Sequence, residues 1–108
     1  MLFLVTDHIR IEFAEANRAL SQMAMLKQSY GMYDDLKARG KLKFSYAFAD
    51  SPGGIMLLDV ESNEELQRIL FLLPSLPFVE RSVKPVTEMK AVLNVIKELE
   101  TIVRSMPK

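Results

Sequence analysis

The sequence predicts an α+β fold with the element order β-α-β-β-α-β, a four-stranded antiparallel sheet and an additional C-terminal helix. Two observations lead to this class. The apolar residues switch repeatedly between the two-residue spacing of strands and the three- or four-residue spacing of helices. Clusters of glycine, proline and small polar residues stand where the spacing changes, as turns do. The chain has 108 residues, which is the size of one domain.

The first two elements are a strand and a long helix. Residues Leu2 to Ile9 are rich in branched and aromatic side chains, which is typical of a strand. Gly40 is placed to end a helix that covers residues 13–39. In this segment the apolar residues recur every three or four positions, as in a helix that buries one face: Phe13, Ala16, Leu20, Met23, Leu26, Tyr30, Tyr33 and Leu36.

A hairpin is expected over residues 42–60. Large apolar side chains alternate with polar or small ones from Leu42 to Phe48, which is the period of a strand. The Asp-Ser-Pro-Gly-Gly sequence at 50–54 favours a chain reversal, because proline fixes φ and glycine accepts a positive φ. Residues 55–60 then form the returning strand.

A second helix is expected over about residues 63–73. Ser62 or Asn63 is placed to cap its first turn, and the prolines at 74 and 77 end it. Residues 78–86 follow as the fourth strand.

Together these elements make the ferredoxin-like plan, in which both main helices cover one face of an antiparallel sheet. Pro85 favours an edge position for the fourth strand, because proline cannot donate a ladder hydrogen bond. Alternate residues on both faces of the sheet are apolar. A second subunit is therefore expected to cover the face that the helices leave open.

The C-terminal helix is expected over about residues 87–106, and the segment 87–108 belongs to the same unit as the domain over 1–86. The helix must pack on its own sheet or on a neighbouring subunit, and the subunit contact is favoured because the second face of the sheet also needs cover. The apolar residues responsible form one stripe, too long to leave in water: Met89, Val92, Leu93, Ile96, Leu99, Ile102, Val103 and Met106.

Composition excludes several classes of function. The 14 basic and 14 acidic side chains cancel, so the charge favours neither nucleic acid nor a membrane surface as a partner. Without cysteine there is no disulfide, thiolate metal site or cysteine nucleophile. No metal or cofactor motif is present. The apolar run at the start is shorter than a signal peptide or membrane span needs, so a cytoplasmic location is expected.

Three residues are candidates for proton transfer. His8 stands near the end of the first strand, and histidine is the residue type best suited to act as a general acid or base near neutral pH. Asp59 and Glu80 lie on different strands and, if they converge, form a carboxylate pair in which one pKa is raised. The alternatives are a partly solvated histidine at a strand end and two carboxylates that face solvent.

Aromatic residues near one helix and one strand are candidates for a binding pocket. A pocket for a small, partly apolar ring compound needs aromatic walls and hydroxyl groups that orient the ligand. The alternative is that these aromatic side chains belong to the ordinary core. The residues are Tyr30, Tyr33, Phe44, Tyr46 and Phe48.

Several short motifs resemble those of the muconolactone δ-isomerase family over about residues 1–86. They are the Leu-Pro-Ser-Leu-Pro-Phe segment at 73–78, the Asp-Val-Glu strand end at 59–61, the Asn-x-Glu-Leu helix start at 63–66 and the Met-Leu-Phe opening. The resemblance implies a ferredoxin-like domain of the dimeric α/β barrel type, which assembles into dimers or larger rings. It also implies chemistry that moves a proton along an unsaturated lactone in aromatic catabolism, with no metal or organic cofactor.

The resemblance further implies polar side chains that this sequence lacks. Phe44 and Ala47 stand where the family is expected to carry His and Arg, Tyr46 where it carries Trp, and Gln67 where it carries His. Three hypotheses follow: a protein that binds a small apolar or aromatic molecule, a cofactor-free isomerase that uses His8 with Glu80 or Asp59, and a structural module that oligomerises without a ligand. The first is favoured, because the replacements make the expected pocket drier.

Overall fold

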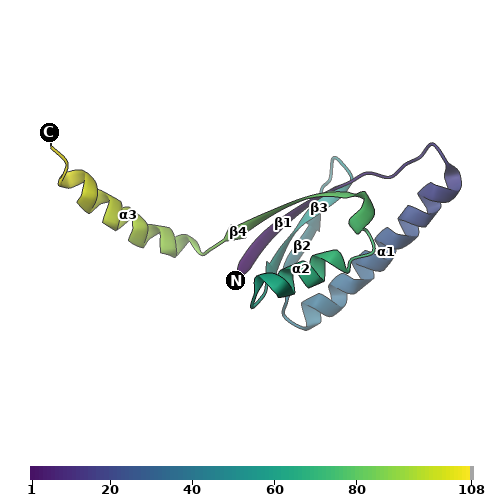
Figure 1. The fold of residues 1–108 in the computed structure, drawn as a ribbon, viewed down its shortest axis with the longest axis horizontal. Helices are drawn as coiled ribbons and strands as arrows, with labels where there is room; N and C mark the ends of the chain where they lie inside the picture. The colour runs from purple at the N-terminus through teal and green to yellow at the C-terminus, as the bar shows by residue number, and fades with distance from the viewer. Residues whose placement is uncertain (108) are drawn as a thin grey trace.

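The computed structural model describes residues 1–107 and has the predicted α+β architecture (Figure 1). Its strands are β1 (Leu2–Ile9), β2 (Leu42–Ala47), β3 (Gly53–Asp59) and β4 (Val79–Val86). Its helices are α1 (Ala16–Ala38), α2 (Asn63–Phe71) and α3 (Met89–Arg104), with a 3-10 turn at Leu76–Phe78. The strands form one sheet in the order β2-β3-β1-β4 with neighbours antiparallel, so the predicted fold class is confirmed.

One face of the sheet carries the helices and the core. Along β1 the side chains of Phe3, Val5 and Asp7 are buried, while those between them are more exposed. Figure 1 shows α1 and α2 together on one side of the sheet. Burying apolar side chains contributes about 1.5–3 kcal/mol each, so this layer is the main source of stability. Its members come from the sheet and from both helical segments: Phe3, Val5, Leu36, Leu42, Met56, Leu58, Val60, Leu70 and Leu73.

The opposite side of the sheet, which we call the open face, has neither α1 nor α2 over it. Strand alternation and the pairing register place an apolar and aromatic group there, each member partly or fully exposed: Leu2, Leu4, Phe44, Tyr46, Ile55, Leu57 and Val86. The same register places polar side chains on this face, half of them on β4: Thr6, His8, Asp59, Glu80, Ser82 and Lys84. Exposed apolar side chains in such a group are unusual for a sheet face without a covering layer.

The long helix begins at Ala16, three residues later than the prediction from Phe13. Phe13 is 70% exposed, so its apolar side chain has no core to enter. The segment before the helix is held by Glu12, whose carboxylate accepts from Arg18 at 2.7 Å and whose backbone N–H donates to Gln22 at 2.8 Å. These bonds fix the lead-in beside the first turns of the helix.

The second helix is capped as predicted and ends two residues earlier than predicted. The Ser62 hydroxyl accepts a hydrogen bond from the backbone N–H of Glu65 at 3.1 Å, which satisfies one of the free donors of the first turn. The helix ends at Phe71 because Pro74 disfavours helical geometry at the residue before it. Residues 76–78 then form the 3-10 turn, so β4 begins at Val79 rather than at Phe78.

The last helix does not pack on its own sheet. In Figure 1 it continues away from the end of β4, and the molecule measures 67 × 31 × 24 Å as a result. No residue of α3 is buried. Of the two contacts expected for its apolar stripe, the one with its own sheet is therefore not made.

Within residues 1–107, none of the helices combines the length and the apolar content that crossing a lipid bilayer requires.

Candidate functional site

A cavity of about 300 Å³ lies between α1 and the helix-bearing face of the sheet, and we call it the α1 pocket. Its volume is at the lower end of the range for small-molecule sites. Ala47 and Gly54, which pair with each other on this face of the sheet, bring no large side chain into the cavity. The lining residues are Val5, Asp7, Ile9, Leu26, Tyr30, Tyr33, Asp34, Ser45, Tyr46, Ala47, Gly53, Gly54, Ile55, Met56, Ser75 and Val79.

A buried ion pair holds the carboxylate in the α1 pocket. Asp7 on β1 and Arg81 on β4 are directly paired in the sheet register. The Arg81 Nε donates to one carboxylate oxygen of Asp7 at 2.7 Å, and Nη2 donates to the other at 2.9 Å. Both side chains are about nine-tenths buried. This bidentate geometry fixes the orientation of the carboxylate and compensates its charge.

Arg81 is itself anchored to α2. Its Nη1 donates to the backbone carbonyl of Leu70 at 3.1 Å, near the C-terminal end of that helix. Arg81 does not line the pocket, so its guanidinium supports Asp7 from outside the cavity. Both oxygens of Asp7 retain lone pairs that a bound molecule can use.

Two phenol groups of α1 face the same carboxylate. Tyr30 and Tyr33, one turn apart, pack edge to face with their ring centres 5.5 Å apart. Burial raises the pKa of Tyr33 to about 12, and the negative charge of Asp7 adds to the increase. The pKa of Tyr30 is raised for the same two reasons. Both phenols therefore stay protonated at neutral pH and can donate a hydrogen bond to a ligand.

The raised pKa of Tyr33 predicts a loss of stability at high pH. A group whose pKa is higher in the folded than in the unfolded chain stabilises the fold fully below the unfolded value of 10.0, and this contribution disappears as the pH rises towards about 12. Across that pH window the free energy of unfolding of the wild type should fall by up to about 2 kcal/mol more than that of Tyr33→Phe. Urea unfolding at several alkaline pH values measures the difference.

Tyr46→Phe is the control for this measurement, because Tyr46 is 68% exposed and its ring is not held in a buried site. This variant should follow wild type across the whole pH range. If Tyr33→Phe and wild type lose stability in parallel, the phenol of Tyr33 is not protected in the folded chain.

A buried serine pair closes one wall of the α1 pocket. Ser29 on α1 is fully buried, and its hydroxyl accepts from the backbone N–H of Ser75 at 2.9 Å. The same hydroxyl donates to the Met25 carbonyl at 3.1 Å. Ser75 lines the pocket, so this bond fixes the turn after α2 against the helix.

The three residues predicted for proton transfer lie outside the α1 pocket. His8 and Glu80 are directly paired between β1 and β4, on the open face. His8 stacks on Phe48 with 5.4 Å between ring centres, and Glu80 forms an ion pair with Arg10 at 2.8 Å. Asp59 pairs in register with Leu2, at the other end of β1.

Asp59 and Glu80 are therefore not brought together. Their register partners on β1, Leu2 and His8, are six positions apart, which is about 20 Å of strand. Asp59 instead contacts the N-terminal amino group of Met1 at 3.4 Å and the ammonium of Lys43 at 3.7 Å. His8 and Glu80 are the two members of the predicted set that the sheet places side by side.

The aromatic residues predicted for ligand binding divide between the two faces. Tyr30 and Tyr33 line the α1 pocket, and Tyr46 borders it although its ring lies on the open face. Phe44 lies on the open face, where its ring is 5.8 Å from that of Tyr46, and neither Phe44 nor Phe48 lines the pocket. Among the positions where the sequence departs from the expected polar pattern, Ala47 lines the pocket and Gln67 does not.

Sequence reasoning missed Asp7 and Arg81, and the signal was present in the strand pattern. Asp7 shares the side of β1 that Phe3 and Val5 occupy, and Arg81 lies between Val79 and Val83 on the matching side of β4. A charged residue in the alternating position of core residues must be paired or functional, because burying an unpaired charge is costly.

Among residues 1–107, no three carboxylate or imidazole side chains lie close enough together to hold an ion.

The sequence matches the family model described as muconolactone delta-isomerase over residues 1–91. A crystal structure of muconolactone isomerase superposes with a TM-score of 0.68 and 22% identity, over 82% of this chain and 90% of that one. The 5-chloro-2-hydroxyhydroquinone dehydrochlorinase from Burkholderia phenoliruptrix AC1100, in complex with 2,5-dihydroxybenzoquinone, superposes with a TM-score of 0.60 and 15% identity, over 84% and 98%. At these identities the two structures show a shared fold. No curated protein sequence matches the chain.

Proposed function

The chain belongs to the muconolactone delta-isomerase family, and on that basis we propose that its α1 pocket binds a small, partly apolar ring compound. The observation that carries this proposal is the buried carboxylate of Asp7, which faces a cavity of about 300 Å³ beside the phenols of Tyr30 and Tyr33. Apolar walls with a few fixed polar groups are the usual form of a small-molecule site. The remaining apolar walls include Val5, Ile9, Leu26 and Met56.

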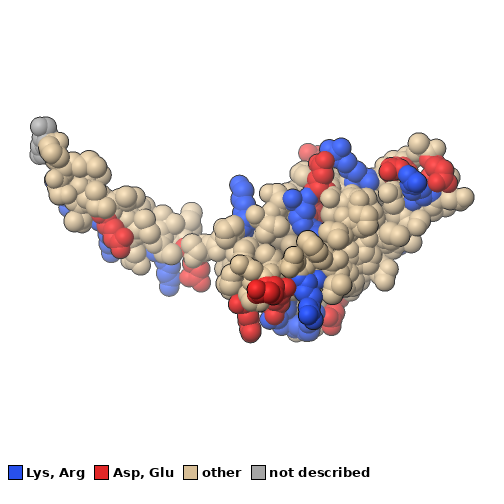
Figure 2. Space-filling model, in the orientation of Figure 1, with Lys and Arg blue, Asp and Glu red and all other residues tan. Residues whose placement is uncertain are grey.

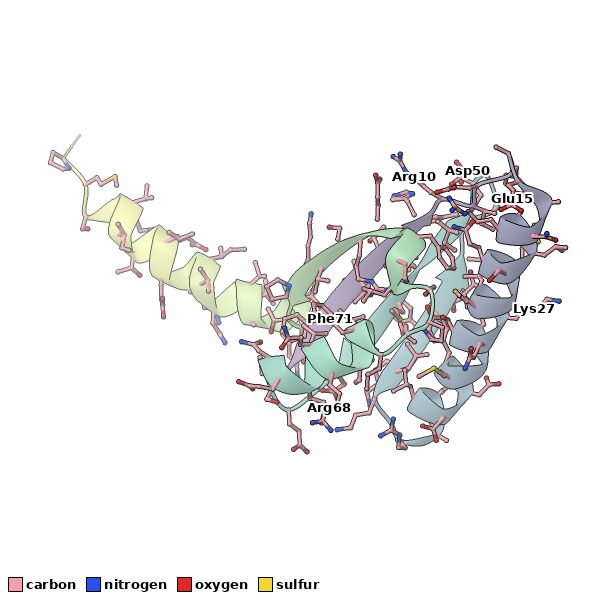
Figure 3. The ribbon with its side chains drawn as sticks, turned by 45° about the vertical axis from the view of Figure 1, so that its right-hand side comes forward. Arg10, Glu15, Lys27, Asp50, Arg68 and Phe71 are labelled. Atoms are coloured by element: carbon pink, nitrogen blue, oxygen red, sulfur yellow. The ribbon has the colours of Figure 1, made fainter. Side chains whose placement is uncertain are left out.

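The charge of the lining supports an uncharged ligand that carries hydroxyl groups. Asp7 lies inside the pocket and Asp34 lies exposed at its edge, and none of the described residues that line it is basic. Lys27, the nearest lysine on α1, extends away from the sheet (Figure 3). A ligand carboxylate would meet the negative charge of Asp34 and has no proton to donate to Asp7, whereas a hydroxyl can donate to Asp7. The site therefore suits a hydroxylated ring better than a ring acid.

A second candidate function is isomerisation by proton transfer, and the position of Asp7 favours it. The carboxylate can remove a proton from a carbon next to a ring carbonyl, so that the electron pair moves to the carbonyl oxygen. The phenols of Tyr30 and Tyr33 can hydrogen-bond that oxygen, and return of the proton to another carbon gives the isomer. His8 with Glu80, on the open face, is the alternative acid and base pair.

Resorcinol and 3-hydroxybenzoate test the ligand class, because they differ only in a hydroxyl that is replaced by a carboxylate. Calorimetric titration at neutral pH should show resorcinol binding at least about tenfold more tightly, a difference of about 1.4 kcal/mol. Asp34→Asn should strengthen binding of 3-hydroxybenzoate several-fold and leave resorcinol unchanged. Asp59→Asn, which removes a carboxylate outside the pocket, is the matched control and should change neither. Tighter binding of the acid would contradict the proposed ligand class, and no binding of either would contradict the site.

The same variants separate binding from catalysis. An unsaturated lactone incubated in deuterated water should exchange its acidic hydrogen in the presence of the wild-type protein. Loss of a general base lowers such a rate by about 10²–10⁴-fold. Both variants are first checked for folding by circular dichroism. If the exchange rate falls by this factor in Asp7→Asn and is unchanged in His8→Ala, the base is Asp7. The reverse pattern assigns it to His8.

We also propose that the chain associates with itself. The open face supports this, because its exposed apolar side chains on β1, β2 and β3 have no covering layer, which is unfavourable in water. No nucleic acid or membrane partner is proposed, and the cytoplasmic location stays a prediction from the sequence.

A further inference from the structure

A cavity of about 210 Å³ lies between the C-terminal half of α1, the start of β2 and α2, and we call it the α1–α2 groove. It shares no lining residue with the α1 pocket. Its walls combine apolar side chains with charged ones, which is the composition of a site for a small molecule with a polar group. The lining residues are Met32, Leu36, Arg39, Lys41, Glu65, Arg68, Ile69 and Leu72.

The floor of the α1–α2 groove is apolar. Leu36 belongs to the buried core, and Met32 and Ile69 pack against that core. Leu72, directly after α2, is 64% exposed beside them. The groove therefore offers a fixed apolar surface, and one of its walls is in contact with water and gains from being covered.

Three cationic side chains stand around this floor. Gly40 has a φ of +74° and turns the chain at the end of α1, which places Arg39 and Lys41 at the rim of the groove. Arg68 comes from the last turn of α2, and in Figure 3 it leaves that helix on the side opposite to Phe71. Figure 2 shows charged atoms gathered at the lower edge of the domain, where α2 and the end of α1 lie in Figure 1. The ends of the two helices therefore bring positive charge to one place.

Two carboxylates balance two of these charges. The Nζ of Lys41 lies 2.9 Å from Oε1 of Glu65, which also lines the groove. The Nε of Arg39 lies 3.0 Å from Oδ2 of Asp35. Arg68 is exposed and forms no ion pair within the part of the chain that the structure describes, residues 1–107. One positive charge is therefore in excess at Arg68, which favours a singly charged anion as ligand.

We propose that the α1–α2 groove binds a small monocarboxylate with an apolar body. The guanidinium of Arg68 can donate two parallel hydrogen bonds to a carboxylate, and the body of the molecule then covers Ile69 and Leu72. A volume of about 210 Å³ limits that body to a short chain or a single ring. The α1 pocket has no basic lining residue, so the two cavities select by charge, an uncharged ring in one and an acid in the other. The groove is a separate site and does not depend on the function proposed for the α1 pocket.

Methyl NMR of the full chain shows which cavity a ligand enters. Met32 and Ile69 line the α1–α2 groove, whereas Met56 and Ile9 line the α1 pocket. Benzoate should shift the signals of the first two and leave the other two unchanged. Benzamide has the same ring without the charge and should bind at least about fivefold more weakly. Acetate has the carboxylate without the ring and should bind at least about tenfold more weakly.

Arg68→Glu reverses the excess charge, and Lys27→Glu is its matched control. Both variants change the net charge equally, and Lys27 is exposed on α1 and lines neither cavity. Arg68→Glu should weaken benzoate binding at least about tenfold, and Lys27→Glu should bind like wild type, with both variants folded by circular dichroism. Calorimetry of 3-hydroxybenzoate with Arg68→Glu then reports the α1 pocket alone, so the two sites are tested separately.

Four results would overturn the inference. They are the absence of shifts at Met32 and Ile69 with about 10 mM benzoate, equal affinity for benzoate in wild type and Arg68→Glu, equal affinity for benzoate and benzamide, and tighter binding of phenylphosphonate than of benzoate. Benzoate shifts confined to Met56 and Ile9 would place the acid in the α1 pocket. They would overturn both this inference and the uncharged ligand class proposed for that pocket.

Discussion

Arg81→Met is expected to destabilise the fold by about 3–5 kcal/mol, the usual cost of removing one partner of a buried ion pair. Methionine fills a similar length of space, so the main loss is the positive charge. The carboxylate of Asp7, about nine-tenths buried, would then have no compensating partner, and the Leu70 carbonyl would lose its donor. Urea unfolding at neutral pH measures the free energy.

Lys84→Met is the control on the same strand, because Lys84 is exposed and points to the other side of the sheet. It should change the free energy of unfolding by less than about 0.5 kcal/mol. Adding Asp7→Leu to Arg81→Met removes the uncompensated charge and should recover much of the loss. A cost below about 1 kcal/mol for Arg81→Met would mean that the pair does not hold β1, β4 and α2 together.

Gly53→Ala is expected to cost more than about 3 kcal/mol and to prevent folding at moderate temperature. Gly53 has a φ of +137°, which residues with a side chain rarely adopt. A Cβ at this position would overlap the backbone carbonyl oxygen of Asp7. The strand pair could only relieve the overlap by separating, which would move Asp7 out of its place in the α1 pocket. Thermal unfolding followed by circular dichroism measures the effect.

Gly31→Ala is the matched control, since it makes the same chemical change at another of the four glycines. Gly31 lies inside α1, and an added Cβ there would meet nothing within 4 Å. Alanine should stabilise the helix by about 0.5–1 kcal/mol. The interpretation of both sites is wrong if Gly31→Ala proves more harmful than Gly53→Ala.

Most of the fold could be predicted because local rules decide it. Spacing of apolar residues located the strands, and the Pro-Gly-Gly turn located the hairpin whose strands β2 and β3 do pair. The Ser62 cap was predicted for a chemical reason that acts within four residues. Phe13 shows the limit of this approach: its spacing continues the helical pattern, but no core lies within its reach.

The site was less predictable, because both faces of β1 are apolar. Leu2 and Leu4 alternate with Phe3 and Val5, so the pattern alone could not say which side the helices cover. That choice decides whether Asp7 or its neighbour His8 lies inside, and the reactivity of imidazole directed the prediction to His8. Tyr30 and Tyr33 were found because helical spacing brings them to the same face. The separation of Asp59 from Glu80 depends on strand register, which no local signal encodes.

The position of β1 at the centre of the sheet has a consequence for how the protein is made. β1 leaves the ribosome before the other three strands, yet one of its two neighbours, β4, lies 74 residues further on at the Asp7–Arg81 pair. At about 5–20 residues per second, synthesis of that stretch takes about 4–15 s. Hairpin β2–β3 can form during this interval, because its strands are close in sequence. Until β4 has been made, the edge of β1 that pairs with β4 has no hydrogen-bond partner and the apolar residues of β1 are only partly covered. Unpaired strand edges of this kind favour aggregation, so the nascent chain is most exposed to aggregation during this interval.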